Sequence, residues 1–505
     1  MTEKKPKPMI ARRAAIIYGM LAIFFIFAAH SAPGQSRPAK SGHTASALLL
    51  SDIHFDPFHD PGKVARLAKA PASEWEAIFA EPASADQPTA FAALQRQCNA
   101  RGVDTSYELF QSSLHAEQNE TRDVKFITLS GDLITHGFSC RYAALLPGKT
   151  PNDYSAFVAR TVEYVTSQLR KTFPGVPLYA ALGNNDSGCG DYRLNEADDF
   201  LKVTAKSIVA GLPKSADQDK ALADFMAGGY YSVMMAAPMR NTRLIVLDDI
   251  FMSQKYTTCG GQKDTSAAAA QIAWLRSQLA EARRQKQRVW VMGHIPPGVD
   301  IYSTFTKMRN VCANEEPVMF LSSDQLGDTL AANADVIRLG LFAHTHMDEL
   351  RLIEPEGSTT GGVKEGGEVA IKMVSSISPV NGNNPSFTVA RIDTAAASLA
   401  DYEVFAASNL TGMGATWSKE YDYAQAYQKA EFTSATVQKL IEGFRADPDA
   451  KTDASRSYID NFFVGDHSSL IKPLWPQYVC ALSHYKAEGF DRCVCGAWQT
   501  HKPTK

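Results

Sequence analysis

Short apolar runs recur between residues 46 and 393 of this 505-residue chain, with helical patterns between them. Most runs are continuous rather than alternating, which is typical of strands buried on both faces. The clearest helical pattern covers residues 267–287, where Ile272, Leu275 and Leu279 share one face. Strands that alternate with helices predict an α/β fold. The runs cover residues 46–53, 124–132, 176–184, 242–250, 288–295, 336–344, 368–376 and 387–393.

Five of these runs end in side chains of the kinds that bind metal ions. Alternate residues of a strand point to one face. Asp52 and His54 are therefore expected to bind one cation together, and so are His344 and His346. Sites in α/β sheets gather at the carboxyl ends of strands, where all five motifs lie. Each motif alone is more typical of a turn or a buried histidine, but the ordered set favours a metal centre. The expected ligands are Asp52, His54, Asp132, Asn184, His294, His344 and His346.

The donor types narrow the choice of metal. Two carboxylates, one amide oxygen and four imidazoles give four ligands to each of two cations if one carboxylate bridges them. The set contains no thiolate, which disfavours soft metals and iron–sulfur clusters. Mixed nitrogen and oxygen ligation suits divalent ions, with Zn²⁺ favoured and Mn²⁺ or Fe²⁺ as alternatives. Two such ions ~3.5–4 Å apart can hold a bridging hydroxide and bind phosphoryl oxygens.

The remaining composition excludes several function classes. Lys and Arg number 51 and Asp and Glu 54, so no basic surplus indicates a nucleic-acid-binding domain. The chain contains no GxxxxGK[ST], GxGxxG or GxSxG motif, which removes support for nucleotide-powered, dinucleotide and serine-nucleophile chemistry.

The order DxH, GD, GN, H and HxH resembles the signature of the calcineurin-like metallophosphoesterases over roughly residues 46–395. The resemblance implies a two-sheet metallophosphoesterase sandwich flanked by helices. It also implies that Asp132 bridges the ions. Asp52, His54 and His346 would complete one site, and Asn184, His294 and His344 the other.

A closer resemblance is to the saposin-free acid sphingomyelinase-like phosphodiesterases. Four segments carry it: SDIHFDP at 51–57, GDLITHGF at 131–138, SSISPVNGNNPSFTVARID at 375–393 and WPQYVCALSHY at 475–485. The third metal block departs from that group, because Asn185 stands where it has a histidine that protonates the leaving group. The GNND sequence of residues 183–186 is similar to the endopolyphosphatases, which offer an alternative reading as a hydrolase of phosphoanhydride chains.

These resemblances imply catalytic roles for Asn184, His294 and His136. The expected reaction is hydrolysis of a phosphodiester by a metal-bridging hydroxide, with His294 stabilising charge on the phosphoryl oxygens. His136 matches a second site histidine of the sphingomyelinase-like group. It would protonate the leaving oxygen, or alternatively hold a neighbouring group by a hydrogen bond. The substrate would be a phospholipid headgroup, a nucleotide or polyphosphate.

The N-terminus predicts export. A basic stretch precedes the apolar run from Ala14 to Ala29, and small and polar residues follow it. Residues 1–32 therefore read as a cleaved signal peptide or a retained N-terminal anchor that contacts the membrane, and residues 33–45 as a linker. Either reading places the remainder in the periplasm or outside the cell.

Eight cysteines suit such a compartment. Cys140 and Cys189 each follow a metal motif, so we expect them to pair. Cys480 is expected to take Cys493 or Cys495.

The chain is divided into a catalytic domain at 46–407 and a small helical, cysteine-containing C-terminal subdomain at 412–505. Nothing in the sequence indicates an oligomeric state.

Overall fold

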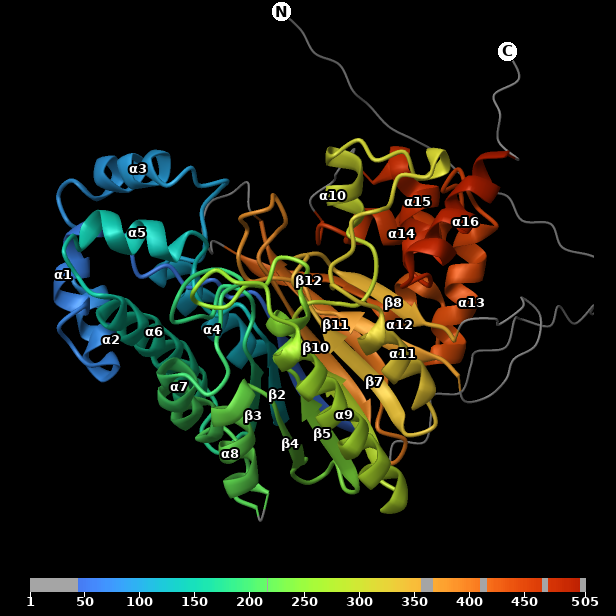
Figure 1. Ribbon diagram of the computed structural model, residues 1–505, viewed down its shortest axis with the longest axis horizontal. Helices are drawn as coiled ribbons and strands as arrows, with labels where there is room; N and C mark the ends of the chain where they lie inside the picture. Colours follow the sequence, from blue (N-terminus) through green and yellow to red (C-terminus); the bar gives the residue numbers. More distant parts are fainter. Residues whose placement is uncertain (1–43, 216, 356–366, 409–415, 466–470, 500–505) are drawn as a thin grey trace, which may run out of the picture. The chain divides into compact units, whose positions relative to one another are not determined.

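The computed structural model describes residues 44–215, 217–355, 367–408, 416–465 and 471–499. Backbone contacts group His43–Lys505 into one compact unit. Its described part contains two mixed six-stranded sheets flanked by helices (Figure 1), which confirms the predicted α/β class and two-sheet sandwich.

The first sheet has the order β12-β11-β10-β1-β2-β3, and its last three strands are parallel. The second has the order β4-β5-β6-β7-β9-β8, with β5, β6, β7 and β9 parallel. The strands are β1 (Thr44–Leu50), β2 (Val124–Ser130), β3 (Leu178–Ala181), β4 (Tyr231–Met234), β5 (Thr242–Val246), β6 (Arg288–Met292), β7 (Ile337–Phe342), β8 (Glu349–Ile353), β9 (Val369–Met373), β10 (Ser386–Asp393), β11 (Ser398–Ala407) and β12 (Trp417–Asp422).

Helices fill the segments between the strands. Figure 1 shows α1–α8 on the side of the molecule where β2 and β3 lie, and α9 beside β5. The helices are α1 (Val64–Leu67), α2 (Ala72–Ala80), α3 (Gln87–Gln97), α4 (Tyr107–Glu120), α5 (Phe138–Leu145), α6 (Pro151–Thr172), α7 (Asp199–Val209), α8 (Gln218–Gly228), α9 (Ser266–Arg284), α10 (Ile301–Thr306), α11 (Gln325–Ala332), α12 (Tyr423–Tyr427), α13 (Ser434–Arg445), α14 (Asp453–Asn461), α15 (Trp475–Ala481) and α16 (Ala487–Gln499).

The main core lies between the two sheets. Phe126 of β2 and Trp290 of β6 have ring centroids 5.8 Å apart. The Trp290 indole donates a hydrogen bond of 2.7 Å to the carbonyl of Ala397. An indole N–H buried in an apolar layer needs such a partner, and this bond ties β6 of the second sheet to the turn between β10 and β11 of the first.

Two sequence expectations need correction. Residues 417–422 are not helical but form β12, which pairs with β11 because an open sheet edge is available there. The predicted linker ends at residue 43, since Thr44 and Ala45 begin β1. The division into two domains at residues 407 and 412 stays a prediction.

The disulfides only partly follow the expectation. Cys480 pairs with Cys493, one of its two expected partners, and Cys312 pairs with Cys495. The predicted Cys140–Cys189 pair is wrong, because Cys140 bonds to Cys98 and Cys189 bonds to Cys259. Cys98 directly follows α3, and Cys259 lies between β5 and α9, so segments between the strands supply both partners.

The predicted signal peptide or anchor lies outside the described residues. Within the part of the chain that is described, no helix has the length and apolar character needed to cross a bilayer.

Candidate metal centre

The ligand-type residues follow their strands instead of lying within them. β1 ends at Leu50 and β7 at Phe342, before Asp52 and His344. The expectation that the Asp/His pairs project from extended strands is therefore wrong. Left-handed backbone occurs at Asp52 (φ 46°), His54 (45°), Asp132 (53°), His344 (74°) and His346 (70°).

Such backbone costs of order 1–3 kcal/mol per residue, so neighbouring bonds must hold it. The amides of Asp52 and His54 donate to the carbonyls of Gly131 and Asp132, each at 3.0 Å. Gly131 has φ 94°, and a Cβ there would come within 2.8 Å of the His294 Nδ1 atom. The two loops after β1 and β2 are thus locked together, and only glycine fits at residue 131.

One group of side chains gathers Asp52, His54 and His346. The Nε2 atoms of the two histidines are 3.1 Å apart, although 292 residues separate them in sequence. Asp52 Oδ1 lies 3.5 Å from His346 Nε2 and 3.7 Å from His54 Nε2. All three side chains are buried.

A second group gathers Asn184, His294 and His344. His294 Nε2 lies 3.2 Å from Asn184 Oδ1 and 3.2 Å from His344 Nδ1. His294 is held from behind, with its Nδ1 atom 2.8 Å from the carbonyl of Ser130.

Asp132 lies between the two groups. Its Oδ2 atom is 3.4 Å from His54 Nε2 and 3.1 Å from His294 Nε2. The structure therefore brings all seven predicted residues to one place, with a single carboxylate shared by both groups.

The arrangement fits divalent cations. Asp52 Oδ1 is buried and has no hydrogen-bond partner among the described residues. Ring nitrogens point at one another at hydrogen-bond distance, so at least one of each pair presents a lone pair. Buried oxygen and nitrogen lone pairs that converge in this way are the donor set of a transition-metal or zinc site.

The histidines of the centre differ in pKa. Burial lowers the pKa of His54, but Asp132 and Asp52 outweigh burial and raise that pKa to about 9. Burial dominates at His346, where it lowers the pKa to about 3. Burial and His294 also hold the pKa of His344 well below its usual value. His344 and His346 are thus neutral, with lone pairs free to bind a cation.

Two buried carboxylates that we did not single out as site residues hold the ligand loops. Asp249 accepts hydrogen bonds of 2.9 and 3.0 Å from the amides of His294 and Ile295. Asp186 accepts bonds from the amides of Gly183 and Leu133 at 2.9 and 2.8 Å. Asp186 belongs to the GNND sequence that we noted, whereas Asp249 had no pattern to mark it.

Asn185 cannot act as an acid, and the structure gives it another contact. Its side-chain amide donates to Asp132 Oδ2 at 2.9 Å, and its backbone amide donates to Asp132 Oδ1 at 2.8 Å. Asn185 therefore orients the carboxylate shared by the two groups.

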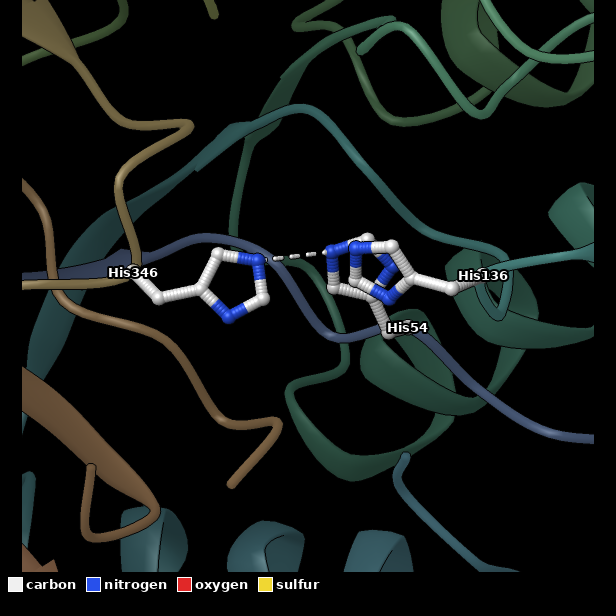
Figure 2. Close-up of side chains that lie close together, drawn as sticks. All are labelled: His54, His136 and His346. Atoms are coloured by element: carbon white, nitrogen blue, oxygen red, sulfur yellow. Dashed lines mark hydrogen bonds between the residues drawn. The ribbon is translucent and has the colours of Figure 1, made fainter. Parts of the chain in front are cut away.

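His136 lies at the edge of the centre. Figure 2 shows its ring over that of His54, with His346 to the left of the pair. The rings of His136 and His54 stack with centroids 3.9 Å apart. The Nδ1 atom of His136 lies 3.1 Å from the buried carboxylate of Asp104, which sequence patterns did not indicate. Asp104 is itself held by the hydroxyls of Thr135 and Ser378, each at 2.7 Å.

The centre opens into a cavity of about 640 Å³. Asp132, His136, Asn184, His344 and His346 line it, so a substrate can reach the shared carboxylate and His136 together.

Comparison with known proteins agrees with this geometry. Residues 46–348, more than half of the chain, match the family described as calcineurin-like phosphoesterase. Human acid sphingomyelinase-like phosphodiesterase 3b is 23% identical and covers 96% of each chain. The mouse cyclic GMP-AMP phosphodiesterase SMPDL3A is 24% identical over 92% of this chain and 95% of its own.

Solved structures give more distant likenesses. A dimetal phosphatase from Danio rerio has a TM-score of 0.38 and 11% identity, covering 72% of this chain and 96% of that one. PhoD has a TM-score of 0.40 and 9% identity, covering 76% and 70%. The family uses divalent metal ions, for which the Asp and His groups described above are suited. The chain belongs to the calcineurin-like phosphoesterase family and is a hydrolase of phosphoesters.

Proposed function

We propose that the chain is an exported phosphodiesterase with two divalent ions, Zn²⁺ being favoured. The observation that carries the proposal is Asp132, whose one carboxylate lies between two groups of histidines. Asp52, His54 and His346 would hold one ion with it, and Asn184, His294 and His344 the other. The similarity to phosphodiesterases over nearly the whole chain supports diester substrates, either nucleotides or phospholipid headgroups.

Divalent ions bound at these residues supply a Lewis acid that activates water and neutralises phosphoryl oxygens. The protein contributes position and charge. Asn185 orients Asp132, and Asp249 holds the loop that carries His294. The loops after β1, β2 and β3 are hydrogen-bonded to one another. The side chains that they carry therefore need little reorganisation to bind the ions.

His136 would donate a proton to the leaving oxygen. Its Nδ1 atom faces Asp104, so the carboxylate keeps that nitrogen protonated and leaves Nε2 as the exchangeable position. The ring is 40% exposed toward the cavity, which allows a substrate to approach it. His136→Gln should slow diesters with poor leaving groups more than activated aryl esters; equal loss on both would remove the acid role.

Export is supported by the cysteines. All eight form disulfides, which persist in oxidising compartments. Recovery of the mature chain from the cytoplasm alone would contradict export.

The central test combines metal analysis with a substrate panel. Purified wild-type protein should contain about two divalent ions per chain and hydrolyse bis-aryl phosphodiesters. Asp132→Asn should lose at least one ion and most of the activity, whereas the exposed control Asp123→Asn should keep both. One ion in the wild type, or full activity in Asp132→Asn, would contradict the binuclear site.

Sphingomyelin, nucleotide diesters and polyphosphate complete the panel, at acidic and neutral pH. Phosphate release from polyphosphate without diester hydrolysis would favour the endopolyphosphatase reading over the phosphodiesterase.

A further inference from the structure

A second cavity, of about 950 Å³, adjoins the cavity into which the candidate metal centre opens. Arg101, Asp300, Tyr302 and Phe320 line both of them. The wall of the second cavity includes residues from the C-terminal helices, among them Phe462, Tyr478 and Leu482. A group attached to a phosphate in the metal centre can therefore extend into this space.

Two of the charged residues in this mainly apolar wall are buried. Glu349 and Arg351 belong to β8, two residues apart, and are only 5% and 4% exposed. Arg351 Nη2 lies 3.6 Å from Glu349 Oε2, which is too long for a hydrogen bond.

The guanidinium is poorly satisfied for a buried group. Its Nη1 atom reaches the carbonyl of Val299 only at 3.5 Å, and its Nε atom has no partner among the described residues. Buried guanidinium groups normally fill their five donor positions, because unmade bonds cost free energy. Because Arg351 lines the cavity, a ligand there can accept from the Nη1 and Nη2 donors, which the long contacts to Val299 and Glu349 satisfy weakly.

Phe320 links this pair to the metal centre. Its ring centroid lies 5.6 Å from that of His344 and 5.3 Å from the Arg351 Cζ atom. The guanidinium therefore lies no more than about 11 Å from the His344 ring. An aromatic ring and a hydrogen-bonding pair are thus available to the organic part of a phosphodiester.

We propose that Glu349 and Arg351 form a base-recognition subsite, which binds the nucleobase of a nucleoside phosphodiester whose phosphate lies in the metal centre. This inference rests on the proposed phosphodiesterase function. Arg351 donates to a ring carbonyl or ring nitrogen, and Glu349 accepts from the adjacent N–H. Guanine fits best, since its Watson–Crick edge presents one hydrogen-bond acceptor beside two donors.

Two other ligands fit less well. A second phosphate would be attracted to Arg351 but repelled by Glu349 beside it. A hydrocarbon chain would cover the Arg351 donors without satisfying them, which costs free energy. A flat base can make both hydrogen bonds while its faces lie against aromatic walls.

The test compares two diesters that share one leaving group, guanosine 5′-(p-nitrophenyl phosphate) and methyl p-nitrophenyl phosphate. The wild type should prefer the nucleoside ester by at least about tenfold in kcat/KM. Arg351→Lys, which keeps the charge but loses the planar fork, should reduce that preference about tenfold or more, mainly through KM. Arg338→Lys, at an exposed arginine of β7, should leave the preference unchanged.

Binding of GMP to the metal-loaded protein, followed by calorimetry, gives a readout independent of turnover. Arg351→Lys should weaken it by a similar factor. Should Arg351→Lys fold poorly, the double variant Glu349→Gln with Arg351→Met takes its place. It removes both charges, so neither residue is left as a buried charge without its partner.

No preference for the nucleoside ester in the wild type, or an unchanged preference and GMP affinity in the Arg351 variants, would overturn the subsite. Better hydrolysis of sphingomyelin vesicles than of the nucleoside ester would overturn it as well. Failure to hydrolyse either aryl diester would count against the phosphodiesterase function, and GMP binding would then decide the subsite alone.

Discussion

Glu117 is a buried carboxyl whose replacement should stabilise the protein in a pH-dependent way. It lies in α4 and is 1% exposed, and its Oε2 atom has no partner among the described residues. Burial raises its pKa from 4.5 to about 8, although a hydrogen bond with Ser113 opposes the shift. Glu117→Gln has the same shape but cannot ionise.

The magnitude follows from this shift. The folded state keeps Glu117 protonated up to about pH 8, whereas the unfolded chain releases the proton near pH 4.5. The stability of the wild type is therefore full below pH 4.5 and falls as the pH rises toward 8. At about 1.4 kcal/mol per pH unit, the loss at pH 7 is about 3 kcal/mol, which Glu117→Gln avoids.

Thermal unfolding between pH 4 and 8 measures the difference. The compact unit His43–Lys505 has about 460 residues, so its unfolding entropy is on the order of 1 kcal/mol per degree. Glu117→Gln should raise Tm by about 3 °C at pH 7 and by almost nothing at pH 4. Glu120→Gln, at an exposed residue of the same helix, is the matched control. A Tm difference that is constant with pH, or shared by the control, would refute the reasoning.

Three other substitutions test the site and its supports. Asp104→Asn should lower kcat for poor leaving groups by at least about tenfold without changing metal content, because His136 loses its orienting carboxylate; lost metal would instead make Asp104 structural. Gly131→Ala should reduce bound metal and the free energy of unfolding. Gly137 is also left-handed, but a Cβ there would meet nothing within 4 Å, so Gly137→Ala should lower the free energy of unfolding by only about 1 kcal/mol. Equal effects of the two variants would contradict the packing argument. Asp56→Asn leaves the Arg141 guanidinium buried without its 2.7 Å ion pair and should lower the free energy of unfolding by about 3–5 kcal/mol. Glu76→Gln, in an exposed ion pair, should lower it by less than about 1 kcal/mol. The same Tm for both variants would contradict this reasoning.

Local sequence patterns were sufficient to predict most of the strands that carry the site. All eight apolar runs contain strands, because a continuous apolar run is a property of neighbouring residues. β4, β8, β11 and β12 were not predicted. β12 has the sequence WSKEYD, which carries charges and depends on β11 for its pairing.

The sequence alone determined which side chains gather in the candidate metal centre, since each stands just after a strand in a recognisable order. Only the tertiary structure decided how they meet. Their left-handed backbone, the carboxylates of Asp104 and Asp249, and the disulfide partners of Cys140 and Cys189 all depend on contacts between distant segments. Glu349 and Arg351 likewise become a candidate subsite only because the C-terminal helices close a cavity beside them. Spacing along a chain records local periodicity. The contacts of Asp104 and Asp249 and the disulfides of Cys140 and Cys189 instead join residues that lie 32 to 70 positions apart, beyond the range of any local pattern.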